Sequence, residues 1–234
     1  MVYNLAERLL TALFPSSCRL CASPGQGDLD LCPDCLADLP RLENACQRCA
    51  RPLAADSDQC ICGQCQQNPP PFQRTKAIFH YAPPVDFLVQ QLKFHADLST
   101  ARLLGSLLAS HIAAGSSPMP DLLLPVPLHR SRQAQRGFNQ ALEIARTTGR
   151  RLNIAVSTRH CSRLRPTASQ SLLPLTARRT NLHGAFQART PLGSPHVAII
   201  DDVMTTGETV RELAQALHQA GAIRVDVWVV ARAG

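Results

Sequence analysis

Long apolar runs, lysine and aromatic side chains are all scarce in this chain. No apolar run approaches the roughly 20 residues needed to cross a bilayer, so the sequence predicts no transmembrane segment. Lys76 and Lys93 are the only lysines, so the binding of anions falls mainly to arginine, whose planar fork suits phosphate oxygens. Aromatic residues make up 4% of the chain, which disfavours a surface that stacks successive bases of a nucleic-acid strand.

The N-terminus does not have the pattern of an export signal. Residues 1–14 carry apolar side chains at helical spacing, but Glu7 and Arg8 lie where a signal peptide needs its apolar core. We therefore expect an amphipathic helix at this end and a cytoplasmic protein. With 234 residues, the chain has room for one mid-sized domain and one smaller domain.

Cysteine is concentrated in one short stretch, because nine of the ten cysteines lie between Cys18 and Cys65. Without an export signal, this density favours metal binding over disulfides or redox-active thiols. A tetrahedral zinc site needs four soft ligands and a CxxC knuckle supplies two, so four knuckles predict two structural zinc ions. The four knuckles are Cys18/Cys21, Cys32/Cys35, Cys46/Cys49 and Cys62/Cys65.

The pairing of these knuckles is open at this stage. In the simplest arrangement the first two knuckles hold one ion and the last two hold the other, and an interleaved arrangement is the alternative. Cys60 is the ambiguous member of the group, because it could replace Cys62 as a ligand. Cys161 is most simply a free thiol.

A change of pattern after three consecutive prolines divides the chain into two parts. Residues 69–71 form a stiff exit linker, so we expect a zinc-binding module with its N-terminal helix over 1–70 and an α/β domain over 71–234. Alternating strands and helices in the second part predict a parallel sheet covered by helices, with ligands at the carboxyl ends of its strands. The expected strands are 76–81, 121–126, 197–200 and 225–230, and the expected helices are 85–94, 98–112, 138–148 and one that includes 210–217.

The segment from Val197 to Val210 joins a hydrophobic strand, two acids, a turn rich in hydroxyl groups and a helix start. The helix start offers unpaired N–H groups, Gly207 permits a close backbone approach, and neighbouring threonines add hydroxyl donors, so the turn suits a monophosphate. No lysine follows Gly207, which excludes a nucleotide-triphosphate loop of the Walker type. The alternative is an acidic turn in which Thr205 or Thr206 merely caps the helix.

The two acids of this segment, Asp201 and Asp202, have two possible roles. They can accept hydrogen bonds from adjacent sugar hydroxyls, or they can help to hold a hydrated magnesium ion. A ribose 5-phosphate would satisfy both the acids and the turn. The segment resembles the motif with which type I phosphoribosyltransferases bind phosphoribosyl pyrophosphate (PRPP). The resemblance implies that Asp201 and Asp202 are catalytic, that PRPP is bound with magnesium, and that the binding residues are Val203, Met204, Thr205, Thr206, Gly207, Glu208 and Thr209.

Further motifs extend the resemblance along nearly the whole chain. The cysteine module is followed by residues 68–74 (NPPPFQR), 81–84 (YAPP), 91–94 (QLKF), 125–127 (PVP) and 136–140 (RGFNQ). Together they resemble the ComF family, which includes the ComFC competence proteins and the GntX-like DNA utilization proteins. Membership implies a zinc-finger domain joined to a phosphoribosyltransferase domain of type I, and a role in using or integrating incoming DNA during natural transformation.

Arginine is clustered between Arg130 and Arg189, where twelve arginines face one acid, Glu143, for a net charge of +11. In the phosphoribosyltransferase fold, residues 128–137 would form the pyrophosphate loop, with Arg130 and Arg136 as the candidate ligands. Exposed arginines on a solvated turn are the alternative. Residues 160–181 lie where that fold has a flexible lid, although a long arginine-rich loop is also often simply mobile.

Three functions fit these patterns. The first is a DNA-uptake protein that binds single-stranded DNA on its arginine face and zinc module, takes PRPP or a related sugar phosphate as ligand, and meets a DNA-processing protein. The second is an active phosphoribosyltransferase with an unidentified acceptor, although only four residues follow the strand expected to end near Val230, which leaves little chain for a base-recognition loop. The third is a PRPP-sensing regulator.

Overall fold

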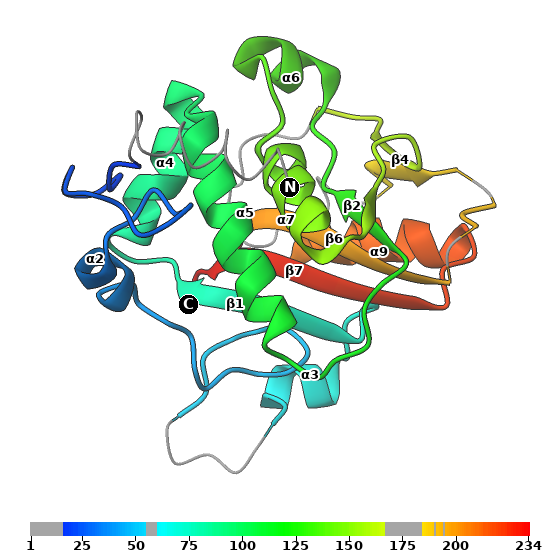
Figure 1. Cartoon of the computed structure of the whole chain (residues 1–234). Coiled ribbons are helices and arrows are strands. Elements are labelled where there is room, and N and C mark those ends of the chain that lie inside the picture. Colours follow the sequence, from blue (N-terminus) through cyan, green and yellow to red (C-terminus); the bar gives the residue numbers. More distant parts are fainter. Residues whose placement is uncertain (1–15, 55–59, 167–183, 190, 194) are drawn as a thin grey trace.

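A parallel five-stranded sheet lies at the centre of the molecule (Figure 1). The computed structural model describes residues 16–54, 60–166, 184–189, 191–193 and 195–234. The order of the strands across the sheet is β1, β7, β6, β2, β3, and each neighbouring pair is parallel. The strands are β1 (Arg74–His80), β2 (Leu122–Pro125), β3 (Ala155–Val156), β6 (His196–Met204) and β7 (Arg224–Arg232).

Strand β6 has a central position, since it pairs with β7 on one side and with β2 on the other. Residues 197–200 of β6 are fully buried, as expected for a strand covered on both faces. The strand does not end there, however, and continues through Asp201 and Asp202 to Met204, which lies opposite Arg232 of β7. The carboxyl end of β6, where an open parallel sheet binds its ligands, therefore coincides with the acid pair.

Helices cover both faces of the sheet. On one face, α4 (Val85–His95), α5 (Leu98–Ala113) and α7 (Gln140–Leu152) pack against Ala198 and Ile200. On the other face, α9 (Glu208–Gln219) packs against Val197 and Ile199 (Figure 1). The division follows from the period of two in a strand, which sends alternate side chains of β6 to opposite faces. The remaining elements are the short helices α2 (Pro33–Ala37), α3 (Gly63–Gln67) and α6 (Arg130–Arg136), and an antiparallel pair of β4 (Cys161–Arg163) and β5 (Phe186–Ala188).

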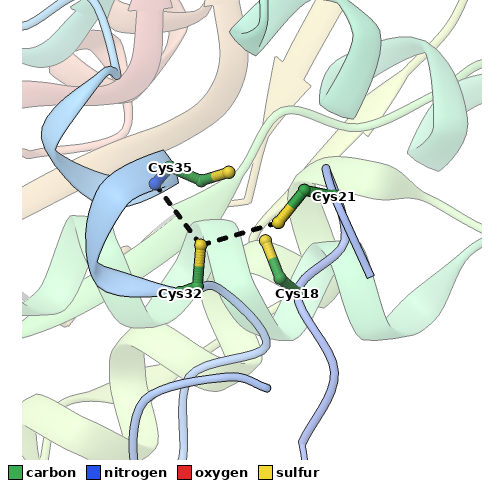
Figure 2. Close-up of side chains that lie close together, drawn as sticks. All are labelled: Cys18, Cys21, Cys32 and Cys35. Atoms are coloured by element: carbon green, nitrogen blue, oxygen red, sulfur yellow. Dashed lines mark hydrogen bonds between the residues drawn. The ribbon is translucent and has the colours of Figure 1, made fainter. Parts of the chain in front are cut away.

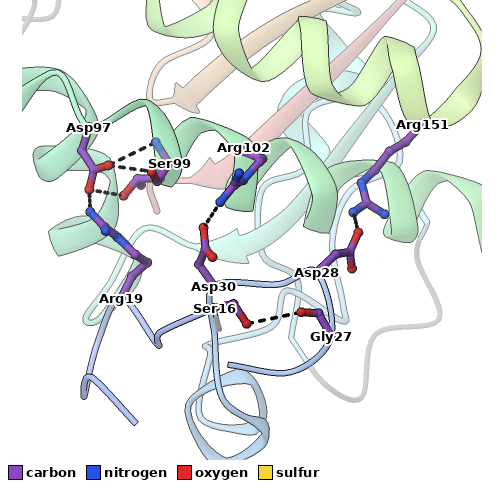
Figure 3. A network of polar contacts seen from close by, with 10 residues as sticks. Ser16, Arg19, Gly27, Asp28, Asp30, Asp97, Ser99, Arg102 and Arg151 are labelled. Carbon is purple, nitrogen blue, oxygen red and sulfur yellow. Dashed lines mark hydrogen bonds and ion pairs between the residues drawn. The ribbon is translucent and has the colours of Figure 1, made fainter. Parts of the chain in front are cut away.

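The cysteine module packs against the sheet domain along two routes. Its middle part lies along the edge strand β1, where Leu42 N donates to Ile78 O at 2.9 Å and His80 N donates to Pro40 O at 2.9 Å. Its first part contacts α5 and α7 through ion pairs, among them Arg102 with Asp30 at 2.5 Å (Figure 3). Leucines of the module also join the two apolar clusters that cover the faces of the sheet.

The structure confirms the predicted class, a parallel α/β sheet with an N-terminal cysteine-rich module. Each strand and helix expected for the second part is present, with bounds that differ by a few residues. The expected helix at 1–14 lies outside the described residues, and the domain boundary at residue 70 stays a prediction. Among the described helices, none combines the length and the apolar character that crossing a membrane requires.

Candidate functional site

Eight cysteines form two separate four-sulfur clusters. Cys18, Cys21, Cys32 and Cys35 make the first cluster (Figure 2), and Cys46, Cys49, Cys62 and Cys65 make the second, with the sulfur atoms of each cluster within 4.8 Å of one another. The Sγ atoms of Cys21 and Cys32 are 3.6 Å apart, and those of Cys49 and Cys62 are 3.7 Å apart. Four Zn–S bonds of about 2.3 Å in a tetrahedron separate the sulfurs by about 3.8 Å. Both clusters therefore fit a structural zinc ion.

The surroundings favour thiolate formation at two cysteines of the first cluster, Cys18 and Cys21, and at Cys46 of the second. Burial opposes ionisation of Cys18, but the backbone N–H groups of Cys32, Cys21 and Leu20 lower the pKa of its thiol to about 6. In the second cluster, burial again opposes ionisation, while the backbone N–H groups of Cys62 and Cys49 lower the pKa of Cys46 to about 7. Because the thiolate is the form that binds zinc, each cluster has a ligand that is ready to bind at neutral pH.

The clusters decide the points that were open in the sequence. The sequential arrangement of knuckles is the one found, and the interleaved arrangement is not. Cys60 is exposed and belongs to neither cluster, whereas Cys62 is buried within the second. Cys161 is buried apart from both clusters, and burial raises the pKa of its thiol to about 12.

The two carboxyl groups at the end of β6 lie close together but differ in burial. Asp202 follows Ile200 on the face covered by α4, and its exposed fraction is 3%. A carboxylate in that position requires a partner, and Lys93 in the last turn of α4 supplies it, with Nζ 2.5 Å from Oδ2 of Asp202. Asp201 is half-buried, and its Oδ1 accepts a hydrogen bond of 2.9 Å from the backbone N of Asp202.

The two carboxyl groups have opposite pKa shifts. Burial raises the pKa of Asp201 well above its usual range, and the neighbouring negative charge of Asp202 raises it further. Burial also acts to raise the pKa of Asp202, but the charge of Lys93 outweighs it, so the net shift is downward. The pair therefore consists of an ionised carboxylate held by a cation and a second carboxyl group whose charge is disfavoured until a ligand or a cation arrives.

The turn after β6 leads directly into the start of α9. Gly207 has φ of +83°, in the left-handed region that favours glycine, and it lies immediately before the first residue of α9. The side chain of Thr206 accepts from the backbone N of Glu208 at 3.5 Å, which is too long for a strong helix cap. The capping role that competed with ligand binding in the sequence therefore receives little support.

A cavity of about 360 Å³ opens beside the acids and the turn. Its wall includes Asp201, Asp202, Thr205 and Thr209 on one side. The cationic part of the wall consists of Lys93, Arg132, Arg136 and Arg163. A larger cavity of about 940 Å³ lies between α5, α7 and β3 and contains none of the motif residues. We take the smaller cavity as the candidate ligand site because both acids of the motif and two threonines of the turn line it together with four basic side chains.

The segment expected to be the pyrophosphate loop contains a helix. Residues 130–136 form α6, and Arg136 in its last turn lines the cavity, where its Nη1 donates to Oε1 of Gln140 at 2.9 Å. Arg130, the other predicted ligand, is exposed at the first position of α6 and does not line this cavity. Arg132 lines it instead. The helical spacing of four residues between Arg132 and Arg136 is the signal that could have identified Arg132.

Other predicted residues are arranged as follows. Val203 and Met204 belong to β6 and not to the turn, and Met204 is buried, whereas Val203 lines the cavity. Gly207 and Glu208 are at the start of α9. The proposed lid falls mostly outside the described residues, which include Arg163 but not Arg178 or Arg179.

Lys93 is the main residue that the sequence did not identify, although the QLKF motif contains it. Nothing in the local sequence pairs it with Asp202, because the two residues are more than 100 positions apart and meet only when α4 packs across β6. The signal that was available is its rarity. The chain has only two lysines, and one of them lies in the last turn of an apolar helix. Such a rare residue at that position indicates a specific role.

Comparison with known proteins identifies the cysteine module first. The family model of the double zinc ribbon domain matches residues 9–66. The chain is 36% identical over 223 residues to DNA utilization protein YhgH of Escherichia coli O157:H7, covering 93% of this chain and 97% of that protein. It is 33% identical over 179 residues to Competence protein F of Haemophilus influenzae, covering 74% and 78%. The protein therefore belongs to the ComF family.

Two more distant similarities complete the comparison. Competence protein ComFC of Bacillus subtilis is 24% identical over 205 residues, which cover 83% of this chain and 80% of that protein. Among solved structures, a purine phosphoribosyltransferase from Pyrococcus horikoshii Ot3 matches with a TM-score of 0.29 and 15% identity, over 62% of this chain and 83% of the other. A TM-score of this size supports no conclusion about the site.

Zinc content tests the assignment of ligands. Cys62→Ser should lower the zinc bound per chain by one ion, because it removes a sulfur from the second cluster. Cys60→Ser is the matched control and should retain both ions, since Cys60 lies outside the cluster. Metal analysis of the two purified variants measures the difference. Loss of zinc from Cys60→Ser with retention in Cys62→Ser would reverse the assignment.

The ion pair of Lys93 and Asp202 predicts a pH-dependent stability. Lys93→Met should reduce the free energy of unfolding by about 3 kcal/mol at neutral pH, because it leaves a buried carboxylate unpaired. In the unaltered protein the pKa of Asp202 is lowered, so the pair stabilises the fold above the unfolded pKa of Asp202, and this contribution disappears as pH falls through the folded value. In the variant, burial alone raises that pKa, so the loss should shrink at mildly acidic pH.

Urea unfolding at neutral and mildly acidic pH measures this effect. Lys76→Met replaces the only other lysine and serves as the control. Burial and the nearby charge of Arg74 lower the pKa of Lys76, so its replacement should cost little at either pH. An equal loss of stability for Lys93→Met at both pH values would contradict the proposed role of the pair.

Proposed function

We propose that this protein acts in DNA utilization and that its α/β domain binds PRPP or a related sugar phosphate, with magnesium. The observation that carries the sugar-phosphate part is the convergence of two acids, a glycine turn and four basic side chains at the carboxyl end of β6. The names of the relatives, a DNA utilization protein and competence proteins, support the biological role.

Each half of a ribose 5-phosphate has a matching part of the site. The terminal phosphate would accept from the N–H groups and hydroxyls of Thr205–Thr209, where the positive end of the α9 dipole favours negative charge. Asp201 would accept from a ring hydroxyl, which relieves the cost of its charge in this half-buried position. Asp202, already paired with Lys93, would hold the end of β6 against α4.

The basic wall of the cavity suits the pyrophosphate of PRPP. Burial lowers the pKa of Arg136, the neighbouring charge of Arg132 lowers it further, and Asp202 acts in the opposite direction, so the two guanidinium groups lie close enough to repel each other. A bound pyrophosphate would offset their repulsion. Magnesium would neutralise part of the ligand's charge, and Asp201 is the carboxyl group at hand for it.

Calorimetric titration of the protein with PRPP and magnesium tests this proposal. Asp201→Asn should weaken binding by about 10- to 100-fold, since a hydrogen bond to a charged group contributes about 1.5–3 kcal/mol. Asp86→Asn, at the start of α4 and outside the cavity wall, is the matched control and should bind as tightly as the unaltered protein. Unchanged affinity in Asp201→Asn would argue against the site.

An assay of pyrophosphate release distinguishes PRPP binding from phosphoribosyl transfer. Magnesium-dependent release of pyrophosphate from PRPP that is lost in Asp201→Asn/Asp202→Asn would identify an active phosphoribosyltransferase. Binding without release across a broad set of acceptors would leave a ligand or a regulator.

The groove between α5, α7 and β3 is the surface that best supports single-stranded DNA binding. Arg102, Arg146 and Arg150 line it, and the side chains of Arg102 and Arg146 are each 57% exposed. Arg102 pairs with Asp30, and Arg146 pairs with Glu143, which also lines the groove, so Arg150 adds a charge beyond these pairs. No aromatic residue lines the groove, so backbone phosphates and not stacked bases would provide the affinity.

The salt dependence of oligonucleotide binding tests this surface. Arg146→Gln/Arg150→Gln should reduce the slope of log affinity against log salt by about 1.4, because each single-strand phosphate contact contributes about 0.7. Arg130→Gln/Arg159→Gln removes the same charge from exposed positions outside the groove and should reduce it less. Fluorescence anisotropy with a labelled thymine oligonucleotide measures both. A complex that is undetectable or insensitive to salt would remove the DNA-binding part of the proposal.

A further inference from the structure

Arg232, the last residue of β7, is a buried cation that joins two distant parts of the chain. Its exposed fraction is 2%, and within the described residues no carboxylate pairs with it. Its Nε donates to the carbonyl oxygen of Cys49 at 3.0 Å, and its Nη1 donates to that of Met204 at 3.2 Å and to that of Ala233. A charged side chain in such a position is retained only when its hydrogen bonds are satisfied, so these carbonyls hold it in place.

The carbonyls of Cys49 and Met204 belong to the second cysteine cluster and to the proposed sugar-phosphate site. Cys49 is a ligand in the second cluster. Met204 ends β6, and Thr205, the first residue of the turn, follows it directly. The backbone N of Ala233 also donates to Met204 O, at 3.0 Å. Both of these donors to the carbonyl just before the turn therefore come from the end of β7.

The knuckle that contains Cys49 is fastened to the sheet at three consecutive carbonyls. Gln47 O accepts from the backbone N of Thr75 at 3.0 Å, and Arg48 O accepts from the hydroxyl of Thr75 at 2.5 Å. Cys49 O then accepts from Arg232. A movement of this knuckle therefore reaches β1 and the end of β7 directly, because the hydrogen bonds leave no flexible segment between them.

Charge makes the link sensitive to the metal. Four thiolates around one zinc ion carry a net charge of roughly −2. In the second cluster this charge would lie beside the buried guanidinium of Arg232, whose Nε donates to the carbonyl oxygen of Cys49. Loss of the metal would release the four sulfurs from one another, so the guanidinium would no longer have a fixed negative charge beside it.

Within the described residues, the first cluster has no ion pair that leads to the turn after β6, although its cysteines pack in the apolar cluster that includes Leu92 and Ile200. Its module contacts α5 and α7 through the ion pairs of Arg19 with Asp97, Arg102 with Asp30, and Arg151 with Asp28 (Figure 3). These pairs are partly exposed, and none of them includes a residue of the turn after β6.

We propose that Arg232 is a positioning residue that couples metal binding at the second cysteine cluster to sugar-phosphate binding at the turn after β6. With the metal bound, Arg232 holds the carbonyl of Met204 and so sets the position of Thr205–Thr209. The inference rests on the proposed function of that turn. Reciprocity follows from thermodynamic linkage, so a sugar phosphate at the turn must also strengthen metal binding at the second cluster.

Titration with ribose 5-phosphate tests the coupling in the full-length, zinc-loaded protein. Arg232→Met should weaken binding by about tenfold, within the usual range of coupling between sites. Arg102→Met removes an arginine that fastens the first cluster and should change the affinity less than twofold, by our rough expectation for an uncoupled site. Equal weakening in the two variants would overturn the proposal.

A conservative variant covers the case in which Arg232→Met does not fold. Arg232→Lys retains the charge but lacks the planar fork that donates to both carbonyls, so it should also weaken binding. Full affinity in Arg232→Lys would overturn the bridging role.

Zinc release supplies a readout that does not depend on variants of Arg232. With a chromophoric chelator, ribose 5-phosphate should slow the loss of one of the two zinc ions. Cys32→Ser, which retains only the second cluster, should still show the slowed phase, and that result assigns it. A sugar phosphate that slows neither ion, or slows the ion of the first cluster, would overturn the coupling. Failure of the unaltered protein to bind ribose 5-phosphate would instead overturn the proposed function and this inference with it.

Discussion

The site depends on one constraint, which is that β6 lies at the centre of a sheet covered on both faces. Such a strand must be apolar wherever helices cover it, so its first polar side chains come at its carboxyl end. Asp201 and Asp202 lie at that end, and the period of two directs Asp202 toward α4, where the positive charge of Lys93 stabilises its carboxylate. The ion pair then leaves Asp201 as the carboxyl group that a ligand can engage, and the turn that contains Gly207 begins at Thr205, three residues after Asp202.

The cysteine module shares its apolar packing with the sheet domain. It has little apolar core of its own, and small units of that kind need a metal to hold their fold. The module is also stabilised by packing against the sheet domain, since Leu42 and Ala50 belong to one apolar cluster and Leu31 and Leu39 belong to the other. The second cluster is also linked to the sheet by a hydrogen bond, because Arg232 at the end of β7 donates to the carbonyl oxygen of Cys49. A DNA utilization protein built this way would carry its metal and its sugar phosphate in one connected framework.

Local patterns predicted those features that depend on neighbouring residues in the chain. The alternation of strands and helices, the CxxC knuckles and the acid–turn–helix segment each lie within a short stretch, and the structure contains each of them. Arg130 shows the limit of this reasoning, since Arg130 and Arg136, two of the three arginines in residues 128–137, were expected at the anion site. The segment forms a helix instead, and helical periodicity turns Arg132 and Arg136 toward the cavity and Arg130 toward solvent.

By itself the sequence determined the class of fold, the presence of two zinc-binding sites among four CxxC knuckles, the ComF relationship and the segment that we propose for a sugar phosphate. These follow from short-range spacing, which chain geometry converts directly into turns, strands and helix starts. Only the tertiary structure decided which knuckles share an ion, that Lys93 pairs with Asp202, and that Arg232 spans the second cluster and the turn. Those contacts join residues far apart in the chain, and they arise from the packing of helices and the module on the sheet, which no local pattern encodes.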